Sequence, residues 1–284
     1  MTSFSNQATL SYLGNIINSN IASGQLLDVL AISKNSLSTG YGPDDNVPYI
    51  ISIVNSDTKA YDNLTVTDNL GSYSFNGKTL TPLSYVDGTV RYYVNGVLQE
   101  APKVTAGPPL VFSGIQVPAQ GNAMLMYEAS TNSYAPPGVG SSLNNEATLT
   151  GDGVSSPIQA AATLAAATKP DLTISKSLSP QTVTGNEEIT YTFMIANYGN
   201  TEADAMDQVA IQDTFNPVLK LNSVTFNGTT WTSPSQYTYN ATTGDFSTVA
   251  GKITVPAATY SQDATTGAWA ITPGVSTLIG TGTI

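Results

Sequence analysis

The sequence predicts an all-β protein of two tandem immunoglobulin-like sandwiches, and three observations support this fold class. Thr, Ser, Asn, Gly, Val and Tyr are abundant while charged residues make up only 10% of the chain, a balance that favours strands and turns over helices. Short segments alternate apolar and polar residues, with Gly, Pro, Asn and Asp between them. The same series of segments occurs twice in 284 residues, a length that suffices for two domains with cores of their own.

The internal repeat sets the expected domain boundaries. The matched segments are 30–34 (LAISK) with 172–176 (LTISK), 49–55 (YIISIVN) with 191–197 (YTFMIAN), 65–68 (TVTD) with 210–213 (AIQD), and 117–119 (VPA) with 255–257 (VPA). We therefore expect domain 1 at 29–151, a linker at 152–170 and domain 2 at 171–284.

The N-terminus carries a segment that resembles the end of a domain. Residues 6–9 (NQAT) recur as 145–148 (NEAT), which close domain 1, and no third copy follows before residue 284. We therefore expect residues 1–12 to be a donor strand, joined to domain 1 by a connector at 13–28. A floppy tail is the alternative interpretation. The residues on one face of the donor strand are Phe4, Asn6, Ala8 and Leu10.

Domain 2 would then lack its last strand and expose an unpaired edge. The donor strand of another copy would complete it, as in donor-strand complementation. Pairing in cis would require the segment to reach past the whole of domain 1. The expected partner is therefore a second copy of the chain, in a head-to-tail series. Other appendage or surface components are further candidate partners.

Side-chain parity along the strands places several polar groups on the core side. Lys34 shares parity with Leu30 and Ile32, and Lys176 occupies the same place in the second repeat. Asp68 and Asp213 fall in line with apolar neighbours, and Asn145 lies between Leu143 and Ala147. Each repeat therefore points an amine and a carboxyl towards its core, with an amide from the closing strand.

A buried lone charge costs several kcal/mol, so these groups must be paired, neutralised or chemically consumed. If they are consumed, the lysine amine and the asparagine amide would react to form a Lys–Asn isopeptide bond. Burial would lower the lysine pKa and raise that of the aspartic acid, which would polarise the amide and shuttle protons. Such a bond forms once, so it is self-processing rather than turnover. Turn residues or partly solvated ion pairs are the alternative.

Composition excludes most other functions. The chain has no Cys and no His, which removes disulfides, thiol and Ser-His-Asp catalysis and most zinc sites. No metal or other cofactor is expected, since acidic residues such as Asp44, Asp45 and Asp152 show no ligand spacing. The net charge of −11 argues against binding nucleic acid or anionic lipid.

The chain shows no apolar stretch long enough to span a membrane and no basic segment followed by an apolar run at its start. We therefore expect either that a secretory signal has been removed or that the protein leaves its cell by another route, such as lysis.

At the repeated motifs the chain resembles a known family. Residues 191–199 (YTFMIANYG), 209–215 (VAIQDTF), the Ser-Lys openings and the Asn-x-Ala-Thr closings are similar to the conserved-repeat domain of bacterial surface proteins. Many members are described as isopeptide-forming, with an arrangement similar to the B-type repeats of collagen adhesins. The short two-repeat members also resemble structural subunits of fibrous appendages on bacterial endospores. The resemblance extends over nearly the whole chain.

The resemblance implies a bond between Lys34 and Asn145, with Asp68 assisting. Lys176 and Asp213 lack an asparagine in their own repeat, a place that Asn6 of the next subunit would fill. The implied role is a structural subunit of an extracellular, cell-surface or spore-surface fibre, and not an enzyme. An adhesin or glycan-binding stalk module, whose N-terminal strand pairs in cis, is the alternative.

Overall fold

The computed structural model describes residues 2–12, 15–26 and 29–284, and these are almost entirely β-strands and loops. Residues 1, 13–14 and 27–28, parts of the expected donor strand and connector, lie outside the described residues. The all-β fold class is confirmed. A single turn of 3₁₀ helix at Ala205–Asp207 lies between strands of the second sandwich. Within the described ranges, no helix is both long and apolar enough to cross a bilayer.

The first sandwich consists of two antiparallel sheets packed face to face. One sheet has the order β12-β11-β15-β6-β5, with β10 paired to β15. The other has the order β13-β14-β7-β16-β17. The first sheet contains β5 (Leu30–Ser36), β6 (Asn46–Asn55), β10 (Leu83–Tyr85), β11 (Arg91–Val94), β12 (Val97–Gln99) and β15 (Asn122–Thr131). The second contains β7 (Tyr61–Asp68), β13 (Lys103–Thr105), β14 (Leu110–Val117), β16 (Ser142–Thr150) and β17 (Ile158–Ala165).

Strict alternation of apolar residues builds this first core. In β6, Tyr49, Ile51 and Ile53 are buried while the residues between them are at least partly exposed. Because strand side chains alternate in direction, one face of each strand enters a single apolar cluster. A short hairpin outside both sheets consists of β8 (Tyr73–Phe75) and β9 (Lys78–Leu80).

The second sandwich repeats this plan with fewer strands in one sheet. Its larger sheet has the order β18-β19-β27-β21-β22, and its smaller sheet has the order β20-β24-β23. The larger sheet contains β18 (Leu172–Ser179), β19 (Glu188–Asn197), β21 (Lys220–Phe226), β22 (Thr229–Thr230) and β27 (Gly274–Thr283). The smaller contains β20 (Gln212–Thr214), β23 (Tyr237–Tyr239) and β24 (Asp245–Thr248). A separate hairpin consists of β25 (Thr259–Gln262) and β26 (Trp269–Thr272).

The N-terminal segment forms an antiparallel hairpin rather than a single strand followed by a connector. β1 (Thr2–Asn6) pairs with β4 (Ala22–Leu26), and β2 (Thr9–Tyr12) pairs with β3 (Asn15–Asn18). The connector expected at 13–28 is therefore wrong for 15–18 and 22–26. β4 begins Ala-Ser-Gly, and these residues carry little strand propensity, while β3 is a four-residue strand in which Asn15 and Asn18 flank two isoleucines.

The linker expected at 152–170 is wrong in the same way, because it contains β17. This strand pairs with β16 over Ser142–Leu149. Its alternate residues Ala162 and Leu164 are 6% and 4% exposed and belong to the core of the first sandwich. The Ala-rich sequence of β17 hides this alternation, since alanine is common in helices, loops and cores alike.

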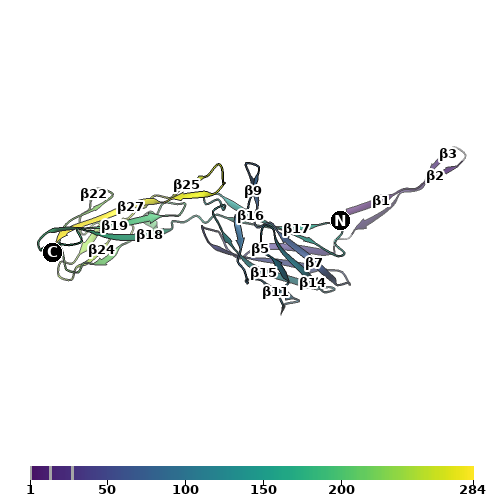
Figure 1. Cartoon of the computed structure of the whole chain (residues 1–284), viewed down its shortest axis with the longest axis horizontal. Helices are drawn as coiled ribbons and strands as arrows, with labels where there is room; N and C mark the ends of the chain where they lie inside the picture. The colour runs from purple at the N-terminus through teal and green to yellow at the C-terminus, as the bar shows by residue number, and fades with distance from the viewer. Residues whose placement is uncertain (1, 13–14, 27–28) are drawn as a thin grey trace.

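The two sandwiches and the hairpin follow one another along a long axis (Figure 1). The hairpin projects from the end of the first sandwich that faces away from the second, and the C-terminus lies at the far end of the second (Figure 1). The sandwiches meet through backbone contacts such as the Trp269 N–H donating to the Ser133 carbonyl at 2.7 Å.

Candidate functional site

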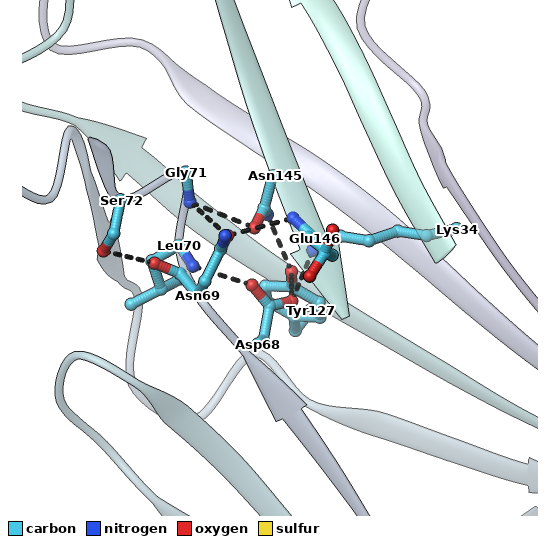
Figure 2. A network of polar contacts seen from close by, with 9 residues as sticks. All are labelled: Lys34, Asp68, Asn69, Leu70, Gly71, Ser72, Tyr127, Asn145 and Glu146. Carbon is cyan, nitrogen blue, oxygen red and sulfur yellow. Dashed lines mark hydrogen bonds and ion pairs between the residues drawn. The ribbon is translucent and has the colours of Figure 1, made fainter. Parts of the chain in front are cut away.

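Three strands of the first sandwich bring Lys34, Asp68 and Asn145 together inside the core (Figure 2). The three residues are 4%, 0% and 0% exposed, as the parity of their strands predicts. The Lys34 amine lies 2.6 Å from Oδ2 of Asp68. An amine, a carboxyl and an amide therefore share one water-excluded site.

Tyr127 of β15 completes the cluster from the same sheet as Lys34, and it faces Asp68 and Asn145 of the other sheet. Its hydroxyl donates a short hydrogen bond to Oδ2 of Asp68. The same hydroxyl accepts a hydrogen bond from Nδ2 of Asn145 at 3.2 Å. The phenol therefore bridges the carboxyl and the amide that lie on either side of it, as the dashed contacts in Figure 2 show.

The turn after β7 aims two backbone N–H groups into the site. Leu70 N–H donates to Oδ1 of Asp68 at 2.9 Å, and Gly71 N–H donates to the amide oxygen Oδ1 of Asn145 at 3.2 Å. Gly71 has a φ of +72°, a conformation in which other residues are strained. Asn69 fixes this turn, because its side-chain oxygen accepts from the N–H groups of both Gly71 and Glu146 at 2.9 Å.

Burial sets the protonation chemistry of the site. Burial lowers the pKa of the Lys34 amine to about 8, an effect that the neighbouring Asp68 only partly offsets. On the order of a tenth of the amines would then be uncharged at neutral pH, against roughly one in three thousand for an ordinary lysine. Burial also raises the pKa of Tyr127 well above its usual value, so its hydroxyl keeps its proton.

These contacts provide the parts that amide exchange requires. Lys34, with its lowered pKa, can act as a nucleophile, and Asn145 offers a carbonyl that it could attack. Gly71 N–H lies where it would stabilise negative charge on the amide oxygen, as donors of oxyanion holes do. Asp68 lies beside the amine and can accept its proton.

The second sandwich holds an open version of the same site. Lys176 and Asp213 form a short ion pair, but their side chains are 38% and 19% exposed. The Lys176 amine lies over the rings of Tyr191 and Phe215, 4.5 and 5.4 Å from their centroids. In the described part of the chain, no asparagine side chain hydrogen-bonds to either member of this pair.

The strand register also shows which residue of the second sandwich occupies the position that Tyr127 has in the first. In the first sandwich, Tyr127 lies opposite Tyr49 on the neighbouring strand. In the second, Gly280 lies opposite Tyr191, the counterpart of Tyr49 in the repeat. The second site therefore has no phenol in this position.

A strand position next to Asp213 is also open. In the first sandwich, β7 pairs with β14 on one edge and with β16 on the other. In the second, β20 pairs with β24 and forms the end of its sheet. Throughout 2–12, 15–26 and 29–284, no strand pairs with the other edge of β20.

The structure places the remaining candidate residues in the N-terminal hairpin. Asn6 is exposed, ends β1 and pairs with Ala22 of β4. Ala8 lies between β1 and β2, and Leu10 in β2 is 61% exposed. For Phe4 only the backbone is described, as part of β1. Within one chain, β1 and β2 lie far from β18, the strand that carries Lys176 (Figure 1).

Sequence reasoning missed Tyr127 and Gly71. Tyr127 lies on the buried face of its strand, as any core tyrosine does, so nothing in the sequence of β15 indicates its contact with Asp68. The signal for Gly71 was the Asn-x-Gly sequence at 69–71, which is typical of a turn that needs a positive φ.

No family model and no curated protein match the chain. Among solved structures, it is similar to BcpA, the major pilin subunit of Bacillus cereus, with 13% identity over 96% of this chain and 73% of that one, at a TM-score of 0.37. It is also similar to the pilus backbone protein RrgB of Streptococcus pneumoniae, with 13% identity over 86% of this chain, at a TM-score of 0.36. The chain spans about half of the RrgB structure, 55%. A third similar structure is the collagen-binding subdomain of the Enterococcus faecalis surface protein ACE, with 6% identity over 49% of this chain and 99% of that one, at a TM-score of 0.30.

Proposed function

We propose that the protein is the structural subunit of an extracellular fibre, on a cell or spore surface, that grows head to tail by insertion of the N-terminal segment into the second sandwich of the next copy. One observation carries the proposal. The first sandwich holds a complete, buried Lys-Asp-Asn site, while the second holds the Lys-Asp pair beside an unpaired strand edge. The chain also carries one additional Asn-x-Ala-Thr segment, at its N-terminus.

In the first sandwich the proposed reaction joins Lys34 to Asn145. The uncharged amine attacks Cγ of Asn145, and Gly71 N–H stabilises the tetrahedral oxygen. Asp68 takes a proton from the attacking nitrogen and passes it to the amide nitrogen, which leaves as ammonia. One C–N bond forms and one breaks, so no oxidant or other reactant is required. Tyr127 holds Asp68 and the departing nitrogen together.

The second bond follows from the register of the first sandwich. There, Ala147 lies opposite Asp68, two residues after the reactive Asn145. If the N-terminal NQAT segment pairs with β20 as NEAT pairs with β7, then Ala8 lies opposite Asp213. Asn6 then takes the position of Asn145 and faces Lys176, with Leu10 opposite Ile211. The donor strand thus supplies the amide that the second sandwich lacks.

The placement of the hairpin favours insertion into another copy over insertion into the same chain. The hairpin projects away from the second sandwich, with the whole first sandwich between them (Figure 1). A contact between two different surfaces of identical chains repeats without closing, and the result is an open filament. Covalent links along such a filament would resist heat, detergent and protease, which suits an appendage on a dormant spore.

Gel electrophoresis after boiling in detergent tests the proposal. The assembled protein should give a ladder of covalent oligomers, and each bond should lower the mass by about 17 Da, the mass of the ammonia that leaves when the nucleophile attacks. Asn6→Ala and Lys176→Ala should abolish the ladder, whereas Lys34→Ala should keep it. If the native chain gives only monomers of unmodified mass, the proposed covalent bonds do not form.

A further inference from the structure

We infer that the donor is the whole two-stranded hairpin formed by residues 2–12 and 15–26, and that its second strand lies against β18 of the neighbouring copy. This inference rests on the proposed function, in which the partner is a second copy of the chain. It assigns to residues 15–26 an intermolecular role that a single donor strand would not need.

The first argument is that the N-terminal hairpin repeats the pairing of β16 with β17. Asn145 lies opposite Ala162 and Leu149 opposite Ile158. In the hairpin, Asn6 lies opposite Ala22, and Leu10 opposite Ile17. Each Asn-x-Ala-Thr segment therefore has a partner strand of its own, with an alanine and an isoleucine at the matching places.

The two hairpins differ by one residue. Between the pairs Thr9–Asn18 and Asn6–Ala22, the first strand advances by three residues and the second strand by four. In β16 and β17, by contrast, both strands advance by the same number of residues. The extra residue falls at the break between β1 and β2. Ala8 and Ser19 bond there through both backbone and side chain, at 2.8 and 2.9 Å. The irregularity is a local β-bulge, and regular pairing continues beyond it with an offset of one residue.

The second argument is that β17 forms part of the core in the first sandwich. It lies beside β5. At the end of β17, Tyr41 N–H donates to the Ala165 carbonyl at 3.1 Å, and Ala167 N–H donates to the Tyr41 carbonyl at 2.8 Å. Ala162 and Leu164 enter the core. A sandwich of this design therefore closes with two strands, of which the second covers β5.

The third argument is that β18, the counterpart of β5, is uncovered. Ile174 is 57% exposed, whereas its counterpart Ile32 packs against the first core. The Lys176 side chain is 38% exposed, whereas that of Lys34 is 0%. The surface that β17 covers in one sandwich is open in the other, and a single strand added at β20 would leave it open.

The hairpin has the surface chemistry of an inserted element. Residues 2–26 contain no charged side chain in a chain of net charge −11, so no ion would have to be desolvated on insertion. Its exposed aliphatic residues include the paired Leu10 and Ile17, at 61% and 51% exposure. This pair corresponds to Leu149 and Ile158, which lie in and against the first core.

Aspartate substitutions on the two faces of the second strand test the inference in the full-length chain. Ile17→Asp places a charge on the face that would enter the neighbour. Ile16→Asp is the matched control, because Ile16 is 72% exposed and points to the other face. Leu10→Asp on the first strand reports on the proposed function itself. Assembly is measured by sedimentation and by the boiled-gel ladder.

We expect Ile17→Asp to reduce assembly at least about tenfold, because a buried unpaired charge is costly, and Ile16→Asp to leave it unchanged. If Leu10→Asp prevents assembly while Ile17→Asp assembles normally, the donor is a single strand and the inference is overturned, with the proposed function intact. Equal loss in Ile16→Asp and Ile17→Asp would also overturn it. Normal assembly of Leu10→Asp would overturn the proposed function and the inference with it.

Discussion

The double variant Lys34→Met/Asp68→Asn separates a covalent bond from a buried ion pair by the sign of its effect on stability. Both substitutions keep the approximate shape of the side chains and remove their charges. The amide introduced at position 68 retains an oxygen that can accept from Leu70 N–H, which donates to Asp68 in the native chain at 2.9 Å. If no bond exists, replacing a buried pair by neutral groups should be neutral or stabilising, by up to about 4 kcal/mol.

If the bond exists, the variant should lose stability. The bond closes a loop from residue 34 to residue 145, and 145 − 34 = 111 residues. By the loop-entropy argument used for disulfides, a cross-link of this length stabilises by about 5 kcal/mol. For a domain of this size that corresponds to a fall in Tm on the order of 15–20 °C.

Calorimetry and intact mass together give the result. The native first sandwich should unfold at the higher temperature with a mass about 17 Da below that of its sequence, since ammonia is the leaving group. The double variant should unfold at the lower temperature without the mass loss. The exposed pair Lys59→Met/Asp62→Asn is the charge-matched control and should behave as the native chain. A double variant as stable as the native chain would refute the bond.

Two further predictions concern the unlinked first site. In Asn145→Ala the Lys34 amine stays free with a pKa lowered to about 8, so the unfolded state binds more protons between pH 8 and 10.5. Stability of this variant should therefore rise by about 2 kcal/mol from pH 7.5 to 9.5 in urea unfolding, and a flat profile would show that the amine is not desolvated. Tyr127→Phe removes the phenol that donates to Asp68 and should slow bond formation at least roughly tenfold, followed as the unmodified mass in newly made protein. An unchanged rate would exclude a role for the phenol.

Residue parity was sufficient to find the buried trio of the first site. Strands have a period of two, so the positions of Leu30 and Ile32 place Lys34 on the core side, and the same rule applies to Asp68 and Asn145. Parity did not reveal Tyr127, because its contact comes from the opposite sheet and depends on how two sheets pack. It predicted the direction of Lys176 but not its exposure, because burial depends on whether another strand covers it.

The strands that the sequence concealed lie in segments with weak strand signals. β4 and β17 are rich in Ala, Ser and Gly, which have low strand propensity, and β3 is a four-residue strand with Asn at both ends and two isoleucines between them. They form strands because a partner strand satisfies their backbone groups, a tertiary effect that a single segment does not show. The repeat of the Asn-x-Ala-Thr motif predicted the first strand of each hairpin, and only the pairing of the backbone revealed the second.

Mixing two complementary variants tests the central claim most directly. Asn6→Ala keeps Lys176 but has no reactive donor, while Lys176→Ala keeps Asn6 but has no acceptor amine. Each alone should run as a monomer after boiling in detergent. Their mixture should give a covalent dimer and nothing larger, with a mass about 17 Da below the sum of its two chains and a cross-linked peptide joining Asn6 to Lys176. A mixture that stays monomeric, or a ladder from either variant alone, would contradict the proposed link between subunits.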